Sequence, residues 1–147
     1  MLGRADPDGL VELIRRHEVD VFAAQELGFD QAEAISSELE FGCLEPHESY
    51  MGMGIALRRP ATYTQVPLQF RPARRVVLDP KDWEGLARPL ELLNVHFQAP
   101  HSITPFPPTL VRHRQVSDLE SFVAANPCDA RLVVGDYNAT PQWPLYR

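Results

Sequence analysis

The segment Arg131–Asn138 ends in two polar side chains whose types could do chemistry. Residues 131–134 are Arg-Leu-Val-Val, a short apolar run that predicts a buried strand, and Gly135 would let the backbone leave it. Asp136 and Asn138 follow and are separated by one residue, so in extended backbone their side chains project from the same side. The carboxylate can accept a proton or orient a water, and the amide can donate to an oxyanion. The same residues also make a good turn, because Asp and Asn bond to their own backbone, and taken alone they favour the turn.

Glu26 stands at the end of a second apolar run. Residues 19–24 are apolar apart from Asp20, which predicts a strand covered on both faces, and Gln25 and Glu26 come directly after it. A carboxylate at the end of a buried strand is a good ligand for a hard cation. The alternative is that Glu26 is simply the first solvated residue after the strand, and without further context that alternative is favoured.

A third candidate, His96, lies near the end of a strand predicted over residues 90–97. Leu92, Asn94 and His96 share one face of this strand, and the other face comprises Leu93, Val95 and Phe97. A lone histidine is more often a hydrogen-bonded structural residue than a catalytic one. A zinc site made by His96, His101 and His113 is disfavoured, because their spacing matches no common zinc pattern.

The elements that would position these residues alternate along the chain. A helix is predicted to start at Asp6-Pro7, with Asp6 as N-cap, and another from Asp30 to about Glu40. A glycine-rich loop over residues 51–57 enters a strand, and no lysine or helix follows it, which excludes a phosphate-binding P-loop. Further strands are predicted over residues 63–66 and 74–78. A long helix begins after the proline-rich loop 100–108 and ends at Asn126-Pro127; its apolar face comprises Val116, Leu119, Phe122 and Val123.

Composition is that of an ordinary globular protein. The 147 residues suit one domain, with 44% hydrophobic and 23% charged residues. A net charge of −6 gives no general attraction to nucleic acid. Five arginines lie close in sequence and are interpreted as a solvated loop surface rather than a phosphate-facing patch: Arg58, Arg59, Arg71, Arg74 and Arg75.

Targeting and redox signals are sparse. Cys43 and Cys128 have neither metal-ligand spacing nor a disulfide pattern. No apolar run is long enough to span a membrane, and no signal-peptide layout is present. The compartment therefore stays open.

Three of these segments occur in the order typical of one family. Gln25-Glu26, His96 and Gly135-Asp136-Tyr137-Asn138 together resemble the endonuclease/exonuclease/phosphatase family. That family includes deoxyribonuclease I-like and exonuclease III-like nucleases, neutral sphingomyelinases and inositol polyphosphate 5-phosphatases. Arg112-His113-Arg114-Gln115 and Asn138-Ala139-Thr140-Pro141 match further family patterns. The ordered set covers nearly the whole chain.

The resemblance implies an α+β fold, a four-layer α/β/β/α sandwich of two mixed sheets with outer helices. It also implies hydrolysis of a phosphoester, with a phosphodiester favoured, by means of Mg²⁺ or Mn²⁺. By family analogy Glu26 binds the metal, and Asp136 orients or activates the attacking water. Asn138 contacts the scissile phosphate, and His96 contacts the phosphate or assists the leaving group. The substrate class (nucleic acid, lipid head group or inositol phosphate) stays open.

Two departures from the family pattern set a further expectation. Family members carry an Asn on an opening strand, whereas Leu2-Gly3-Arg4 already leads into the first helix. Members also end in a strand with an Asp-His pair, and this chain stops at Arg147 before one. We therefore expect a single domain over residues 1–147 that lacks both segments, has reduced or no activity, and could self-associate through open sheet edges. The alternative is a non-catalytic remnant or interaction module of the same fold.

Overall fold

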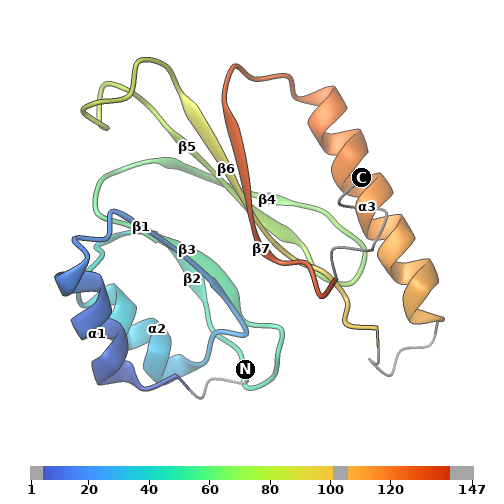
Figure 1. Cartoon of the computed structure of the whole chain (residues 1–147), viewed down its shortest axis with the longest axis horizontal. Coiled ribbons are helices and arrows are strands. Elements are labelled where there is room, and N and C mark those ends of the chain that lie inside the picture. Colours follow the sequence, from blue (N-terminus) through green and yellow to red (C-terminus); the bar gives the residue numbers. More distant parts are fainter. Residues whose placement is uncertain (1–4, 101–105, 140–147) are drawn as a thin grey trace.

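The computed structural model describes residues 5–100 and 106–139 (Figure 1). The elements of this part of the chain are, in order, α1 (Pro7–Arg16), β1 (Val21–Gln25), α2 (Phe29–Ser36), β2 (Phe41–Glu45), β3 (Met53–Leu57), β4 (Thr62–Val66), β5 (Ala73–Leu78), β6 (Leu90–His96), α3 (Pro108–Ala125) and β7 (Arg131–Asp136). Within these ranges, no helix is both long and apolar enough to cross a membrane.

The strands form two sheets. The first sheet has the order β1-β3-β2, and both of its pairings are antiparallel. The second sheet has the order β4-β5-β6-β7 and is mixed, because β6 and β7 run parallel while the other pairs are antiparallel. The expected α+β class with two sheets is confirmed, but in the described residues the first sheet is antiparallel and not mixed as expected.

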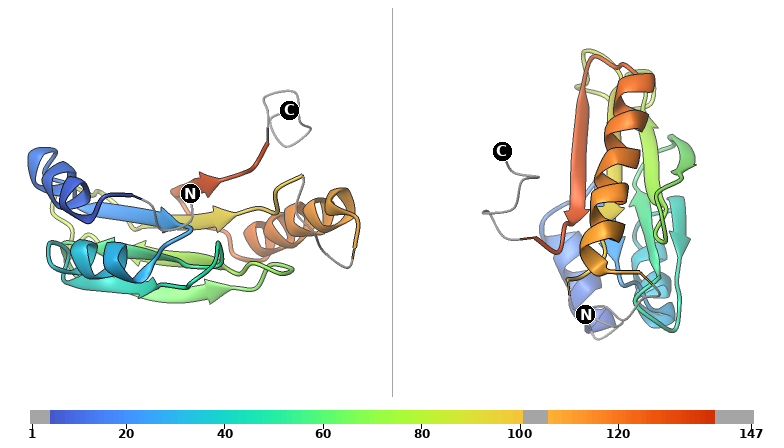
Figure 2. Two further views of the ribbon diagram at one scale, coloured as in Figure 1. Left: turned by 90° about the horizontal axis from the view of Figure 1, so that it is seen from below. Right: turned by 90° about the vertical axis from the view of Figure 1, so that its right-hand side faces the viewer.

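Three apolar clusters show how the layers stack. One cluster joins α1 and α2 to the first sheet and includes Ile14, Ile35 and Ala56. A second lies between the sheets and includes Ile55, Val76 and Leu92. A third joins the second sheet to α3 and includes Leu93, Val95, Phe97 and Leu119. The layers are therefore helix, sheet, sheet, helix, and Figure 1 and the left view of Figure 2 show the strands between α1 and α2 on one side and α3 on the other.

Strand β6 lies at the centre of this arrangement, and its two faces are used as the sequence predicts. Leu93 and Val95 face α3, while Leu92 and Asn94 face the first sheet. Asn94 is fully buried. Its Nδ2 donates to the carbonyl oxygens of Ala24 and Gly54, both at 2.9 Å, and its Oδ1 accepts from Gln25 Nε2 at 2.5 Å. A single amide thus connects the second sheet to two strands of the first.

The first two helices start differently. Asp6 caps α1 as predicted, since its Oδ2 accepts from the Gly9 N–H at 3.2 Å, and Pro7 is the first helical residue. The predicted start of α2 at Asp30 is wrong: the N-cap is Gly28, and Asp30 lies inside the first turn. The predicted end near Glu40 is also too late, because α2 ends at Ser36 and the chain turns to enter β2.

Strand β7 is not the buried strand that its apolar run predicts. It occupies the edge of the second sheet, and Leu132 is 49% exposed. Gly135 does not release the backbone either: it pairs with Val95, and the ladder continues to Asp136, whose carbonyl oxygen accepts from the Phe97 N–H at 2.8 Å. An apolar run specifies a strand, but its place in the sheet depends on pairing with distant segments.

Candidate functional site

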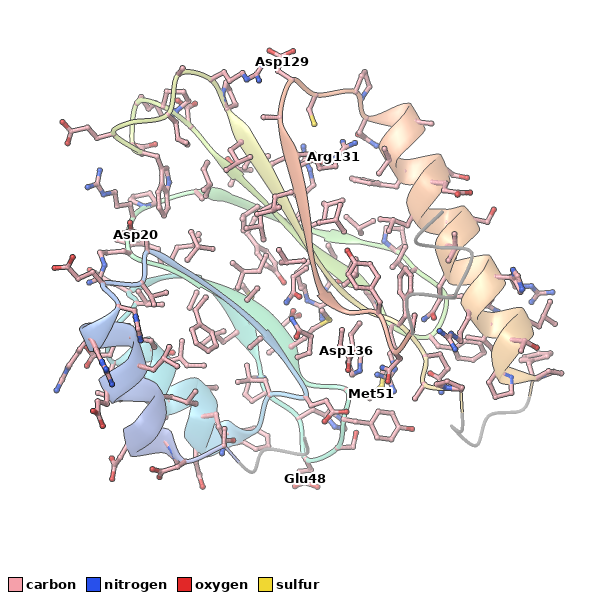
Figure 3. All side chains as sticks on the ribbon, in the orientation of Figure 1. Asp20, Glu48, Met51, Asp129, Arg131 and Asp136 are labelled. Carbon is pink, nitrogen blue, oxygen red and sulfur yellow. The ribbon has the colours of Figure 1, made fainter. Side chains whose placement is uncertain are left out.

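His96 and Asp136 lie side by side because β6 and β7 are parallel and these two residues are register partners. Partners in register point to the same face of a sheet. The distance from His96 Nε2 to Asp136 Oδ2 is 3.9 Å. The His96 side chain is buried, whereas that of Asp136 is 47% exposed. In Figure 3, Asp136 lies at the same end of the sheets as Met51, and Arg131 and Asp129 lie at the opposite end.

Glu26 reaches the same place from the first sheet. It follows β1, and its Oε1 is 4.0 Å from His96 Nε2. Its backbone has a φ of +54°, a left-handed conformation that is uncommon for a residue with a side chain. The next residue, Leu27, is held on both sides, since its N–H donates to the Gly52 carbonyl at 2.9 Å and its carbonyl accepts from the His47 N–H at 3.0 Å. The loop between β2 and β3 therefore fixes the turn that presents Glu26.

Arg71, from the loop between β4 and β5, is the fourth charged or titratable residue at this point. It is only 5% exposed, and its Nη1 lies 2.6 Å from Nε2 and 2.9 Å from Nδ1 of His96. Its guanidinium carbon is 4.6 Å from the centre of the Tyr50 ring, a cation–π distance. Sequence reasoning missed both Arg71 and Tyr50 as site residues. They are 21 positions apart, and no local pattern links two loops.

The expected solvated arginine surface is therefore wrong for three of its five members. Arg71 and Arg74 are buried, and Arg74 Nε donates to Glu45 Oε2. Arg75 Nε donates to Glu91 Oε2 at 2.6 Å. Arg58 and Arg59 are exposed, as expected. For Arg74 and Arg75 the reason is alternation along β5, because a strand between two layers turns each of its side chains toward one of them.

The electrostatics keep His96 neutral. Burial, together with the adjacent Arg71 cation, lowers the pKa of His96 to about 4, and the nearby Asp136 carboxylate opposes this only in part. Near neutral pH, its contacts with Glu26 and Asp136 are therefore contacts of a neutral imidazole and not ion pairs. Burial also lowers the pKa of Arg71, but a guanidinium remains a cation in this pH range.

Asn138 does not project beside Asp136 from extended backbone. Its φ is +46°, and its backbone N–H donates to Asp136 Oδ1 at 2.8 Å. The turn that these residues alone favour is thus the observed conformation. Asn138 Nδ2 donates to the Phe97 carbonyl at 2.8 Å, and the Asn138 carbonyl accepts from Arg112 Nη2 at 2.7 Å.

Helix α3 holds the loops around the site. Gln115 is fully buried; its Oε1 accepts from the Gln98 N–H at 2.9 Å and its Nε2 donates to the Gln69 carbonyl at 2.8 Å. Asp118 Oδ2 accepts from the Gln69 N–H at 3.0 Å. Arg112 is 3% exposed, and its Nη2 donates to the Asn138 carbonyl. One helix face thus anchors the segments that carry Arg71, His96 and Asn138.

The donor set suits a hard cation with few protein ligands. Within residues 5–100 and 106–139, no group of three or more His, Cys, Asp or Glu side chains is arranged to hold a metal ion. Mg²⁺ needs only one or two carboxylates, since waters and phosphate oxygens complete its shell, and Glu26 and Asp136 fit that type of site. Of the residues in the disfavoured zinc site, His113 is exposed on α3 and His101 lies outside the described residues. Thr140 and Pro141 of the family pattern also lie outside them.

Solved structures with the same fold come from TDP2. The chain matches humanized D. rerio TDP2 carrying 14 mutations with a TM-score of 0.69 and 18% identity, covering 91% of this chain and 55% of that one. It matches TDP2 from C. elegans with a TM-score of 0.62 and 14% identity, over 92% and 43%. It also matches D. rerio TDP2 complexed with a single strand DNA product, with a TM-score of 0.61 and 18% identity, over 91% and 54%.

The chain thus spans about half the length of these structures, and at such identities they show the fold alone. No curated protein matches this sequence. The family model described as Endonuclease/Exonuclease/phosphatase family matches residues 2–147, nearly the whole chain. Together with the layered sheets and the ordered Glu26, His96 and Asp136 segments, this match establishes that the chain belongs to the Endonuclease/Exonuclease/phosphatase family.

Proposed function

We propose that this chain carries active-site residues of a divalent-metal-dependent phosphoester hydrolase whose substrate is a phosphodiester. The observation that carries the proposal is the convergence of Glu26 and Asp136 on His96, at 4.0 and 3.9 Å, from strands of two different sheets. Two carboxylates and a neutral imidazole, brought together where β1, β6 and β7 end, suit metal-assisted attack of water on a phosphoryl group.

Each residue takes one role in this proposal. Glu26 would hold Mg²⁺ or Mn²⁺, and the metal would supply charge neutralisation at the phosphoryl oxygens. Asp136 orients the attacking water with Oδ2, because Oδ1 already accepts from the Asn138 N–H. His96, neutral near pH 7, contacts the phosphate or assists the leaving group. Asn138 has two amide hydrogens; one bonds Phe97, and the other would donate to a phosphoryl oxygen.

Among substrate classes we favour nucleic acid over lipid head groups and inositol phosphates. The support is that a protein of the same fold, D. rerio TDP2, has been captured with a single strand DNA product. The net charge of −6 argues against binding by general attraction, so contacts at the site would have to supply the affinity. Binding of an oligonucleotide should fall with added salt, with a slope that counts the phosphates contacted.

The test is hydrolysis of bis-p-nitrophenyl phosphate with Mg²⁺ or Mn²⁺ and with EDTA, in the wild type and in Asp136→Ala. We expect metal-dependent turnover that falls at least about 100-fold in the variant, since a positioned acid–base group contributes on the order of 10²–10⁴. Asp129→Ala, an exposed change at the opposite end of β7, is the matched control and should keep its activity. Near-full activity in Asp136→Ala would refute the role of Asp136.

A non-catalytic interaction module is the second candidate; its support is that no three His, Cys, Asp or Glu side chains of the described residues are grouped to hold a metal ion. This candidate predicts that the chain folds without divalent metal and is not stabilised by it. It also predicts no turnover in the wild type or in Asp136→Ala. We also propose that copies could self-associate through the edge of β7, where the apolar Leu132 is half-exposed. Sedimentation over a concentration series tests this, and Leu132→Lys should then favour the monomer.

A further inference from the structure

We propose that Arg71 is an anion-binding residue of the candidate site and donates to a phosphoryl oxygen of the bound phosphoester. The ligand named here rests on the proposed function, but the evidence for an anion at this position is independent of it. That evidence is a buried charge that forms no ion pair, held in a fixed orientation beside His96.

Arg71 forms no ion pair within the described residues, and the Asp136 carboxylate attracts its charge only from a longer distance. The side chain of Arg71 is 5% exposed, yet no carboxylate of residues 5–100 or 106–139 lies within 4.0 Å of it, and its buried Nε has no hydrogen-bond partner there. Arg74, which lies three residues later on β5 and is buried to a similar degree, is paired with Glu45. A buried charge is strongly unfavourable unless it is paired, so the site is built to receive a negative group.

The orientation of Arg71 is fixed from two sides. The Tyr50 ring lies 4.6 Å from its guanidinium carbon, and Nη1 contacts the His96 ring at 2.6 Å. The loop that carries it is tied to α3 through both backbone groups of Gln69, by Asp118 and Gln115. A donor held in place before the ligand arrives binds it without the entropic cost of ordering a long side chain.

The chemistry of the guanidinium selects the ligand class. Its planar N–H groups match the oxygens of a phosphate, and such charge-assisted bonds are stronger than neutral ones. Arg71 would therefore contact the same phosphoryl group as the metal held by Glu26. This arrangement places a fixed cation where negative charge concentrates during hydrolysis.

Binding of inorganic phosphate without metal, measured by calorimetry and thermal shift, tests the inference directly. We expect phosphate to bind the wild type and to raise its melting temperature. In Arg71→Gln its affinity should fall at least tenfold, and Arg71→Lys should recover part of the loss. Arg59→Gln, an exposed arginine between β3 and β4, is the matched control and should bind as the wild type does.

Without phosphate, Arg71→Gln should melt no lower than Arg59→Gln, because the change removes an unpaired buried charge. A lower melting temperature with unchanged phosphate affinity would show a purely structural role and overturn the inference. If Arg71→Gln does not fold, Arg71→Lys decides by the same affinity criterion.

Kinetics separates this inference from the proposed function. If the wild type hydrolyses bis-p-nitrophenyl phosphate, Arg71→Gln should raise KM at least tenfold. Unchanged kinetics together with unchanged phosphate affinity would overturn the inference and leave the hydrolase proposal standing. Phosphate binding that depends on Arg71, without any turnover, would support the inference while the hydrolase proposal fails.

Discussion

At Gly135, strand β7 approaches β6 more closely than any side chain would allow. A Cβ added there would lie 1.9 Å from the Val95 carbonyl oxygen, and the φ of +135° is disfavoured for other residues. The close approach keeps Asp136 in register with His96. Glycine at this position is therefore a condition for the site and not merely a turn residue.

We predict that Gly135→Ala lowers the free energy of unfolding by about 3 kcal/mol, because both a backbone collision and a strained φ oppose it. Gly85→Ala is the control: its φ is +94°, but no atom lies within 4 Å of the added Cβ. It should cost only about 1 kcal/mol. Urea unfolding measures both, and equal losses in the two variants would contradict the argument.

Residue types predicted members of the candidate site only where their order along the chain followed the family pattern. Glu26, His96 and Asp136 each follow or end a predicted strand, and the structure places both carboxylates within about 4 Å of His96 Nε2. Arg71 and Tyr50 had no such signal. Arg71 was grouped with its neighbours in sequence, and only the packing of two loops reveals that it is buried beside His96.

Among the elements, β6 connects the two sheets through one buried amide. Asn94 joins it to the first sheet, and its side chain bonds two carbonyls and one amide there. We predict that Asn94→Leu lowers the free energy of unfolding by about 3 kcal/mol, since two buried carbonyls and Gln25 Nε2 each lose a partner. Thr64→Val, an exposed change on β4, should leave it within about 0.5 kcal/mol. A small loss in Asn94→Leu would mean that the sheets do not depend on this amide.

At its first residues, β6 also holds an ion network. Glu91 is buried, and its carboxylate accepts from Arg75 on β5 and from Arg131 on β7. Burial alone would raise the pKa of Glu91, but the hydrogen bonds from Arg131 and Arg75 and their positive charges outweigh it, so the pKa is lowered. The folded state therefore binds a proton less readily than the unfolded chain. Stability from Glu91 is present above the unfolded value near 4.5 and is lost as the pH falls through the lower folded value.

We predict that Glu91→Gln destabilises the protein by about 3 kcal/mol at pH 7, because it breaks a buried charge network. The difference from the wild type should shrink as the pH falls below about 4.5. Urea unfolding at pH 7, 5 and 3.5 measures it, with exposed Glu84→Gln as the control. A difference that stays constant over this range would mean that the charge of Glu91 is not responsible.

The sequence predicted the presence of helices and strands more reliably than their boundaries or their exposure to solvent. The Asp6 cap, the two faces of β6 and the apolar face of α3 follow from local spacing, and the structure has all three. The start of α2 could not be predicted, because the backbone of Leu27 is fixed by Gly52 and His47 from another loop. The exposure of β7 depends on its edge position, which no local pattern records.

On the scale of the whole molecule, stabilisation by a metal bound at one site must be separated from stabilisation by general screening of charge. The net charge is −6, so any divalent cation reduces self-repulsion and can raise stability without a site. Glu26 makes the distinction measurable, because it is the proposed ligand and its side chain is 22% exposed. Comparison at equal ionic strength, with NaCl in place of MgCl₂, removes the general contribution.

We predict that 10 mM Mg²⁺ stabilises the wild type by about 1.4 kcal/mol if its dissociation constant is about 1 mM, which corresponds to a rise of about 3–6 °C in melting temperature. EDTA should reverse the shift. Glu26→Gln should lose it, whereas Glu33→Gln, an exposed change on α2 that removes the same charge, should keep it. Equal shifts in the two variants would assign the effect to net charge and remove Glu26 as a ligand. A shift that depends on Glu26 would mean that the ends of the two sheets form a metal site even in a chain about half as long as its structural relatives.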